Sequence, residues 1–286
     1  MRYEAPDSIE GAVALLSAAT GETRVLAGGT DLLVQMRADV VDPDLIVDIK
    51  KIAETRAITE EKGGWRIGAA VTGAELKEHP RLKSVWPGVI EAANLIGSTQ
   101  VQGRATLGGN LCNGSPAADS VPALIAAGAL ATLAGPQGRR DLPVEDVMLG
   151  PRKLALRKGE IVVSFLLPPR PPRSSDAYLR FIPRTEMDIA VVGAGVSLTL
   201  DGAGTITAAR VGLGAVAARV LLVAEAAQAI IGSRLDLPAQ QRLEAAARAA
   251  CRPIDDKRGT IEFRTDVAAV LTRRAALIAL DRARTS

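Results

Sequence analysis

Two glycine pairs in loops of small and polar residues constrain this chain more than any other feature. Residues 27–31 read AGGTD, and residues 105–119 read ATLGGNLCNGSPAAD. Glycine adopts positive φ readily and lets backbone N–H groups approach a bound oxyanion closely, so such loops can hold phosphate without a lysine. Either pair alone is most simply a turn. Two pairs in one chain predict two loops that share a ligand, and a pyrophosphate fits that description.

The residues around each glycine pair extend this hypothesis. Thr30 and Asp31 can cap a helix that begins at about Leu32, which would direct the partial positive charge of its N-terminus at the ligand. The second loop supplies short hydrogen-bonding side chains suited to a polyhydroxy chain, namely Thr106, Asn110, Asn113, Ser115 and Asp119. A buried carboxylate at Asp119 would need partners, and sugar hydroxyls are good ones. A dinucleotide with a ribityl or ribose arm has both chemical parts.

Length, composition and charge exclude several classes of protein. The 286 residues, 48% of them hydrophobic, allow one large or two ordinary domains with full cores. The 35 basic residues nearly balance the 32 acidic ones, so nothing indicates a nucleic acid or an anionic membrane as a partner. The apolar runs are too short and too rich in glycine and alanine to span a bilayer. The amino terminus lacks the regions of a secretory signal, so we expect a cytoplasmic protein.

Cysteine and histidine are too scarce to build a metal centre. The chain has only Cys112 and Cys251, and its single histidine is His79. These residues cannot form an iron–sulfur cluster or a histidine-built metal site, so no metal is expected and any redox centre must be an organic cofactor. Cys112 is expected to be a small packing residue rather than a reactive thiol, and His79 to end a helix. Trp65 and Trp86 are expected in the core.

Hydrophobic periodicity predicts an α+β chain. Before residue 168, strands are expected at 24–26, 45–49, 65–70, 129–133 and 160–166, and helices at 9–19, 32–37, 72–77 and 81–95, with a short helical turn from Pro143. The segment 168–176, PPRPPRSSD, lacks hydrophobic periodicity and is expected to be the linker between two domains. Beyond it, strands are expected at 177–181, 191–200 and 205–213, with a hairpin turn at 201–204, and helices at 221–231, 238–250 and 261–284.

Three stretches of the chain resemble a known protein family. RVLAGGTDLLVQMR, IGSTQVQGRATLGGNLCNGSPAADSVPALIAAGA and RTEMDIAVVGAG are similar to the signature stretches of the FAD-binding medium subunits of molybdenum hydroxylases, which include xanthine, carbon monoxide, nicotinate and aldehyde dehydrogenases. The resemblance covers nearly the whole chain. It implies a PCMH/VAO-type FAD-binding domain over 1–172, with subdomains at about 1–55 and 56–172. A smaller α+β domain like that of the carbon monoxide dehydrogenase flavoprotein, with a three-stranded antiparallel sheet and helices, would follow over 173–286.

The resemblance also implies a set of cofactor-binding residues. The first phosphate-binding turn would comprise Ala27, Gly28, Gly29, Thr30 and Asp31, and the second Thr106, Gly108, Gly109 and Asn110. Asp119 would hold the ribityl hydroxyls, with Asn113 and Ser115 nearby. Arg180 corresponds to a basic position close to the flavin ring, where a cation would stabilise the reduced flavin; the alternative is an ordinary exposed arginine on a strand. Arg184 and Asp188 are expected to form a salt bridge that holds a loop rather than to contact the flavin.

The same resemblance implies partners. Medium subunits of this family work with a large subunit that carries the molybdenum cofactor and a small subunit with two 2Fe–2S clusters, in a dimer of heterotrimers. FAD, held noncovalently, would pass electrons to a small-molecule acceptor. The shortage of cysteines agrees with clusters that lie on another chain. Two alternatives remain open at this point: a stand-alone FAD-dependent reductase of the same fold, and a noncatalytic FAD-binding module that assists assembly.

Overall fold

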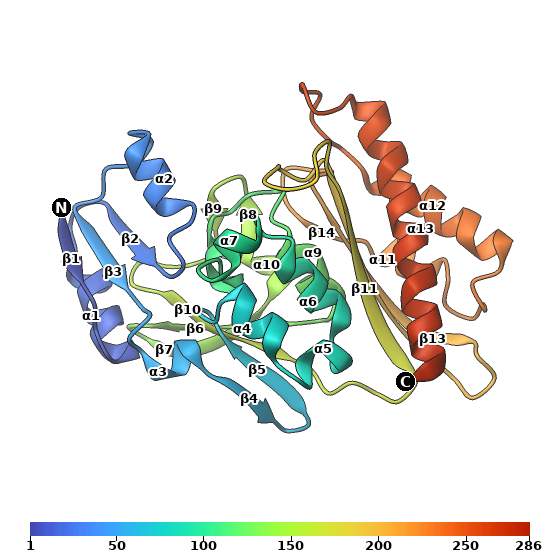
Figure 1. The fold of residues 1–286 in the computed structure, drawn as a ribbon, viewed down its shortest axis with the longest axis horizontal. Coiled ribbons are helices and arrows are strands. Elements are labelled where there is room, and N and C mark those ends of the chain that lie inside the picture. The colour runs from blue at the N-terminus through green and yellow to red at the C-terminus, as the bar shows by residue number, and fades with distance from the viewer.

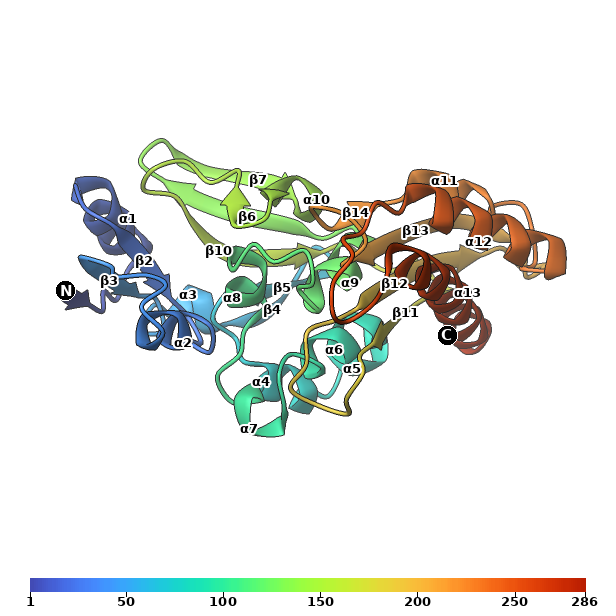
Figure 2. The ribbon, with the colours of Figure 1, turned by 90° about the horizontal axis from the view of Figure 1, so that it is seen from above.

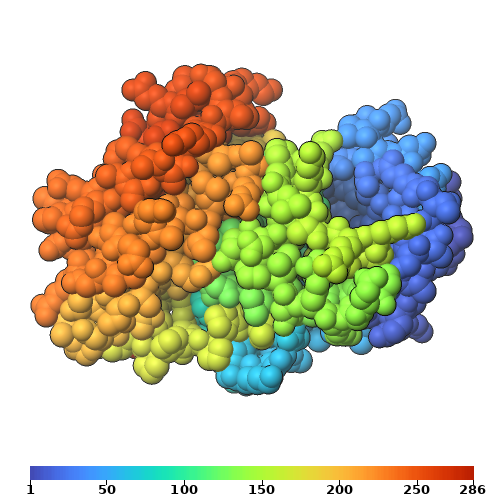
Figure 3. Space-filling view, turned by 180° about the vertical axis from the view of Figure 1, so that it is seen from behind, coloured from blue at the N-terminus to red at the C-terminus, as the bar shows by residue number.

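The chain is arranged as three units in a row (Figures 1 and 2). The computed structural model describes residues 1–286. A first lobe (residues 1–56) surrounds a parallel sheet, a middle lobe (57–173) surrounds a five-stranded sheet, and a C-terminal unit (174–286) has a four-stranded sheet. The same row is visible from behind, from the blue first lobe to the orange C-terminal unit (Figure 3). No helix combines the length and the apolar composition that crossing a membrane requires.

The first lobe is a small parallel α/β unit. Its elements are β1 (Arg2–Glu4), α1 (Ile9–Ala18), β2 (Thr23–Leu26), α2 (Leu32–Arg37), β3 (Leu45–Asp48) and α3 (Ala53–Arg56). The strands lie in the order β1-β3-β2 and are all parallel, so the predicted β2-α2-β3 unit is confirmed, while β1 was not predicted. Ser8 Oγ accepts a hydrogen bond from the Gly11 amide at 3.2 Å. This cap starts α1 where the sequence predicts it.

The middle lobe is built on an antiparallel sheet in the order β4-β5-β10-β6-β7. Its elements are β4 (Ile58–Glu61), β5 (Gly64–Gly68), α4 (Gly73–Glu78), α5 (Leu82–Val85), α6 (Pro87–Asn94), α7 (Thr99–Gln102), α8 (Leu107–Cys112), α9 (Ser120–Ala126), β6 (Leu130–Gly135), β7 (Gly138–Pro143), α10 (Val144–Val147), β8 (Met148–Gly150), β9 (Lys153–Leu154) and β10 (Ile161–Leu167). Thr72 and Glu75 form a reciprocal capping box that starts α4. Trp65 and Trp86 are buried in the core of this lobe, as predicted.

Two expectations for the middle of the chain were wrong in detail. The helix expected over 81–95 is split into α5 and α6, because Pro87 disfavours helical geometry at Trp86, whose φ is −127° and ψ 61°. The expected linker is shorter than 168–176, because β11 begins at Ser174. The proline-rich segment is also held in place: Arg170 donates to Asp176 Oδ1 at 2.9 Å, and its Cζ lies 3.9 Å from the centroid of the Trp86 ring.

The C-terminal unit has one more strand than expected. Its elements are β11 (Ser174–Phe181), β12 (Val192–Leu200), β13 (Ile206–Gly214), β14 (Leu221–Leu222), α11 (Ala224–Gln228), α12 (Leu237–Ala250) and α13 (Ile261–Thr285). Residues 221 and 222 pair with β13, so the helix expected over 221–231 is reduced to α11. Asp201 Oδ1 accepts from the amides of Ala203 and Thr205 and shapes the predicted hairpin turn.

The sheet of the C-terminal unit is closely joined to the middle lobe. α13 packs along β11 and β12, and α9 of the middle lobe packs on β12 and β13 (Figure 2). At this contact α9 lies directly on backbone: a Cβ added at Gly195 or Gly212 would come within 2.7 or 2.3 Å of the Pro122 carbonyl oxygen. The absence of side chains at these two positions therefore lets the helix and the sheet approach each other.

Candidate functional site

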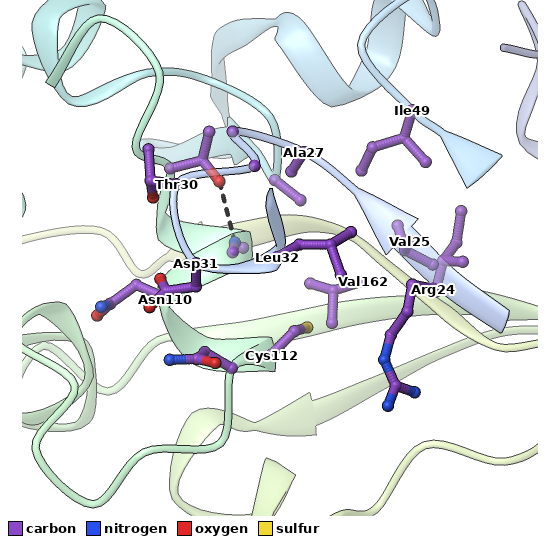
Figure 4. Close-up of a pocket in the computed structure, with 18 of the residues that line it drawn as sticks. Arg24, Val25, Ala27, Thr30, Asp31, Leu32, Ile49, Asn110, Cys112 and Val162 are labelled. Carbon is purple, nitrogen blue, oxygen red and sulfur yellow. Dashed lines mark hydrogen bonds between the residues drawn. The ribbon is translucent and has the colours of Figure 1, made fainter. Parts of the chain in front are cut away.

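A cleft of about 350 Å³ is lined by residues of the first and the middle lobes. This volume is in the range of small-molecule sites. Ten of the residues expected at the site line it, from both glycine loops: Ala27, Gly28, Gly29, Thr30, Asp31, Thr106, Gly108, Gly109, Asn110 and Asn113. Figure 4 shows Thr30 and Asp31 of the first loop together with Asn110 and Cys112 of α8 among the residues that line the cleft. The two loops, which lie far apart in the sequence, therefore meet in the structure.

Gly28 is the point of contact between the two loops. A Cβ added at this residue would lie 2.0 Å from the Arg104 carbonyl oxygen and 3.2 Å from Ala105 Cα. The first loop thus rests on the backbone that leads into the second. The next residue, Gly29, has a φ of +79°, in the left-handed region that glycine favours. Both glycines are required by the backbone geometry of the cleft.

The first glycine loop presents backbone donors that have no acceptor within the protein. None of the amides of residues 27–31 donates to a backbone or side-chain oxygen of the chain. Backbone N–H groups that are unpaired within the protein need a partner from solvent or from a ligand. Successive amides of this kind, in a glycine loop at a cleft, form an anion-binding concavity. The residues present therefore fit a phosphate or diphosphate group.

α2 begins at the predicted residue but without the predicted side-chain cap. Asp31 occupies the N-cap position and makes no capping hydrogen bond. The protein around its carboxylate displaces water and thereby raises the pKa of Asp31 above its ordinary value. The helix is tied to the second loop instead, since Gln35 Nε2 donates to Asn113 Oδ1 at 3.0 Å.

The second loop orients its polar groups through internal hydrogen bonds. Thr106 Oγ1 accepts from the Gly109 amide at 2.9 Å and starts α8. Asn110 Oδ1 accepts from the amide and the hydroxyl of Ser120, at 3.0 and 2.7 Å. Because its oxygen is occupied, the side chain of Asn110 keeps both N–H donors for a ligand. A Cβ added at Gly109 would meet only Thr106 Oγ1, at 3.0 Å, within 4 Å.

Asp119 and Arg180 do not line the cleft, and Arg180 is not the exposed strand arginine that the sequence allowed as an alternative. The guanidinium is buried, with 3% of the side chain exposed, and donates to the Leu95 carbonyl at 2.7 Å and to Asp119 Oδ2 at 3.1 Å. Burial raises the pKa of Asp119 to about 6, against the opposing effect of Arg180. Arg180 is therefore the ion-pair partner of Asp119, on a strand of the C-terminal unit. The other carboxylate oxygen, Asp119 Oδ1, has no hydrogen-bond partner.

The remaining residues singled out from the sequence have structural contacts. Ser115 lies outside the cleft and its hydroxyl accepts from the Ala117 amide at 3.2 Å. His79 Nδ1 accepts from the Leu82 amide at 3.1 Å, so it ends α4 as predicted. Arg184 Nε lies 3.2 Å from Asp188 Oδ2, which confirms the predicted salt bridge.

Cys112 faces the cleft at the end of α8 (Figure 4). Its side chain is exposed to the cleft, yet the protein around that recess raises the pKa of the thiol to about 12. The thiol therefore stays protonated at neutral pH, and a protonated thiol is a poor nucleophile. This agrees with the expectation that Cys112 is not a reactive thiol, whereas its exposure to the cleft differs from the packing role expected from the sequence.

The cleft also has an apolar side that the sequence analysis did not identify. It is formed by Val25, Ile49, Leu154, Leu156, Ile161 and Val162. Val25 lies within a quoted signature stretch, but Ile161 and Val162 belong to an apolar strand that reads like any buried strand. The cleft is also lined by two arginines, Arg24 and Arg152, that were not predicted as site residues from the sequence.

Comparison with known proteins decides the family. The sequence family described as the FAD binding domain in molybdopterin dehydrogenase matches residues 1–170. This chain is an FAD-binding medium subunit of the molybdenum hydroxylase family. The family described as the CO dehydrogenase flavoprotein C-terminal domain matches residues 177–279 of the medium subunit. The medium subunit is therefore an oxidoreductase flavoprotein.

Similar proteins agree with this family along most of the chain. The medium subunit is 35% identical over 273 residues to the carbon monoxide dehydrogenase medium chain of Afipia carboxidovorans, covering 96% of this chain and 94% of the relative. It is 32% identical over 255 residues to a putative xanthine dehydrogenase FAD-binding subunit of Escherichia coli strain K12, covering 88% and 87%. The crystal structure of a Cu,Mo-CO dehydrogenase in its cyanide-inactivated form contains a chain that superposes with a TM-score of 0.94 at 35% identity, covering 99% and 98%.

Proposed function

We propose that the medium subunit binds FAD in the cleft between its first two lobes and passes electrons through it to a small-molecule acceptor. The electrons would come from 2Fe–2S clusters on a small partner subunit, after oxidation of a substrate at the molybdenum cofactor of a large one. The assembly would be a dimer of heterotrimers in the cytoplasm. The named relatives, which are subunits of carbon monoxide and xanthine dehydrogenases, support this proposal.

One observation carries the proposal: residues 27–31, whose amides have no partner in the protein, line a cleft that the second glycine loop shares. These amides, with Thr106 and the Asn110 amide group, would hold the diphosphate. The apolar side of the cleft would receive a ring system, because burying aromatic surface there is favourable. When bound, FAD supplies the one- and two-electron chemistry, and the protein supplies binding and orientation.

Asp119 and Arg180 would act as positioning residues. Their ion pair joins the end of the second glycine loop to β11, so it fixes that loop without lining the cleft. Asp119 Oδ1, which has no hydrogen-bond partner within the protein, would accept a hydrogen bond from a ribityl hydroxyl. Asn113 would hold α2 through Gln35, and Ser115 would shape its own turn.

The cofactor would be held noncovalently. Covalent attachment needs a nucleophilic side chain beside the flavin. Cys112 is the thiol in the cleft, and its raised pKa keeps it protonated. His79 is engaged with Leu82 at the end of α4 and does not line the cleft.

The chain would divide into an FAD-binding domain over 1–172, with subdomains at about 1–55 and 56–172, and a C-terminal domain over 173–286. The two family matches, which leave residues 171–176 between them, support this division. The cluster of 26 buried residues that lies wholly within the C-terminal segment supports that boundary as well.

The test is to purify the chain with whatever co-elutes, record its visible spectrum and release the cofactor with acid. We expect one FAD per chain, free in the acid supernatant, and co-eluting large and small subunits with iron–sulfur absorbance. A folded chain that takes up no FAD on titration would contradict the proposal. Dithionite reduction followed by addition of NAD, a quinone or oxygen then tests turnover. A flavin that no acceptor reoxidises would favour the noncatalytic assembly module.

A further inference from the structure

The cleft contains a single cation without a partner. Its charged residues are Arg24, Asp31, Arg152 and Glu160. Arg24 pairs with Glu22 at 2.6 Å, and Glu160 pairs with Arg140 at 2.8 Å. The Arg152 side chain makes neither an ion pair nor a hydrogen bond within the protein, and Asp31 lies beyond ion-pair distance of it. An anionic ligand in the cleft would find its unpaired positive charge at Arg152.

The backbone places Arg152 at this position at a conformational cost. With Pro151 it forms the two-residue turn between β8 and β9, and its φ is +58°. This position of such a turn favours glycine or asparagine, which tolerate positive φ. An arginine in this conformation is disfavoured locally, and such residues concentrate at ligand sites.

The turn is also anchored to the second glycine loop. The Arg152 amide donates to the Gly114 carbonyl at 2.9 Å. A Cβ added at Gly114 would lie 2.9 Å from Arg152 Cα, so the two backbones are in direct contact. The backbone of the turn that carries the Arg152 guanidinium is therefore fixed to the second glycine loop, which also carries Asn110 and Asn113.

We propose that Arg152 binds a phosphate group of a nucleotide held in this cleft. A guanidinium matches phosphate geometry with two parallel N–H donors and keeps its charge at all physiological pH values. It would supply the positive charge that the neutral amides of residues 27–31 lack. The inference rests on the proposed FAD site. The phosphate could belong to the diphosphate of FAD or to that of a pyridine dinucleotide acceptor, and the experiment separates these sources.

The experiment titrates the flavin-free full chain with FAD and with riboflavin, which lacks phosphate, and follows flavin fluorescence. Arg152→Gln, Arg152→Lys and wild type are compared at two salt concentrations. The matched control is Arg157→Gln, an exposed arginine three residues past the end of β9 that does not line the cleft. We expect Arg152→Gln to weaken FAD binding about 10- to 100-fold and to reduce its salt dependence. Arg152→Lys keeps the charge but loses the paired donors, so it should recover only part of the affinity, and Arg157→Gln should stay within about twofold of wild type.

Riboflavin provides the readout that a structural role would not give. Its affinity should be the same in wild type and in Arg152→Gln, because it has no phosphate to lose. If FAD binding is unchanged but NADH binds the FAD-loaded Arg152→Gln variant more weakly than wild type, the phosphate site serves the acceptor. Two results for Arg152→Gln would overturn the inference while leaving the FAD site intact. One is an equal loss of affinity for FAD and riboflavin, and the other is an unchanged affinity for both FAD and NADH. Wild type that binds no FAD would overturn the proposed function as well.

Discussion

The first lobe and the C-terminal unit differ in how they are stabilised. The hydrophobic cluster of the first lobe has twelve buried residues, and four of them, Ala70, Ala134, Ile161 and Val163, belong to the middle lobe. The cluster of the C-terminal unit has 26 buried residues, all from its own segment. α2 buries none of its residues, whereas α13 buries ten. The main hydrophobic cluster of the C-terminal unit is therefore formed by its own segment, whereas that of the first lobe depends on residues of the middle lobe.

This difference follows from the position of the cleft. One side of the first lobe forms the cleft surface with its glycine loop, so that side cannot be filled with large side chains. A bound ligand would stabilise this part by binding the folded state only. The C-terminal unit forms none of the cleft surface and packs its sheet on both faces. Substitutions in the two regions should therefore affect different measurements.

The largest effect is expected at the contact between the glycine loops. Gly28→Val places a side chain on the Arg104 carbonyl oxygen, where even a Cβ would approach to 2.0 Å. The loops must then separate, and we expect FAD affinity to fall by about 1000-fold, which corresponds to about 4 kcal/mol. Gly103→Ala is the control, because Gly103 has nothing within 4 Å of an added Cβ and a φ of −67°. Full flavin occupancy in the Gly28 variant would argue against converging loops.

The C-terminal unit should respond in stability rather than in FAD binding. Leu243→Ala removes a fully buried side chain from its core and should lower the free energy of unfolding by about 2–5 kcal/mol. Leu33→Ala on α2, at a residue that is 55% exposed, should lower it by less than about 0.5 kcal/mol. Urea denaturation and FAD titration of both variants check this. A change of FAD affinity in Leu243→Ala, at temperatures where the variant is folded, would contradict the claim that the C-terminal unit does not affect FAD binding.

A smaller effect on binding is expected at Gly109. Gly109→Val directs a side chain toward the cleft and meets only Thr106 Oγ1 within the protein. FAD affinity should fall by about 30-fold, or about 2 kcal/mol, while the unfolding temperature of the flavin-free chain stays close to that of wild type. Fluorescence titration and thermal unfolding measure the two quantities. If the flavin-free variant is strongly destabilised, Gly109 serves the fold rather than the cleft.

The smallest effect concerns pH. The pKa of Asp119 is about 6 in the folded chain, above its ordinary value of 3.8, so between these values the folded state binds more protons than the unfolded state. Stability should therefore decrease as pH rises from about 4 to about 6, by about 1 kcal/mol for each pH unit between the two pKa values. Asp119→Asn should flatten this part of the stability curve, measured from urea midpoints. Asp146→Asn, at an exposed carboxylate, is the control; the same slope in Asp119→Asn and wild type would contradict the assignment.

The parts of the structure that depend on local chemistry could be predicted from the sequence. Ser8 and Thr72 start their helices where expected, and the two glycine loops meet. Pairings between distant residues could not be predicted. Arg180 and Asp119 are 61 positions apart, and nothing near either residue indicates that they form a buried ion pair. The apolar side of the cleft could not be predicted for another reason. Ile161 and Val162 have the same sequence pattern as strand residues that are buried in the core.

Hydrogen exchange of the amides of residues 27–31 tests the central claim most directly. In the flavin-free chain these amides have no protein acceptor, so they should exchange quickly. When FAD is bound at full occupancy, we predict that their exchange slows by at least about tenfold, while segments in the core of the C-terminal unit keep their rates. Unchanged exchange at residues 27–31 with FAD fully bound would show that the diphosphate lies elsewhere, and would contradict this account.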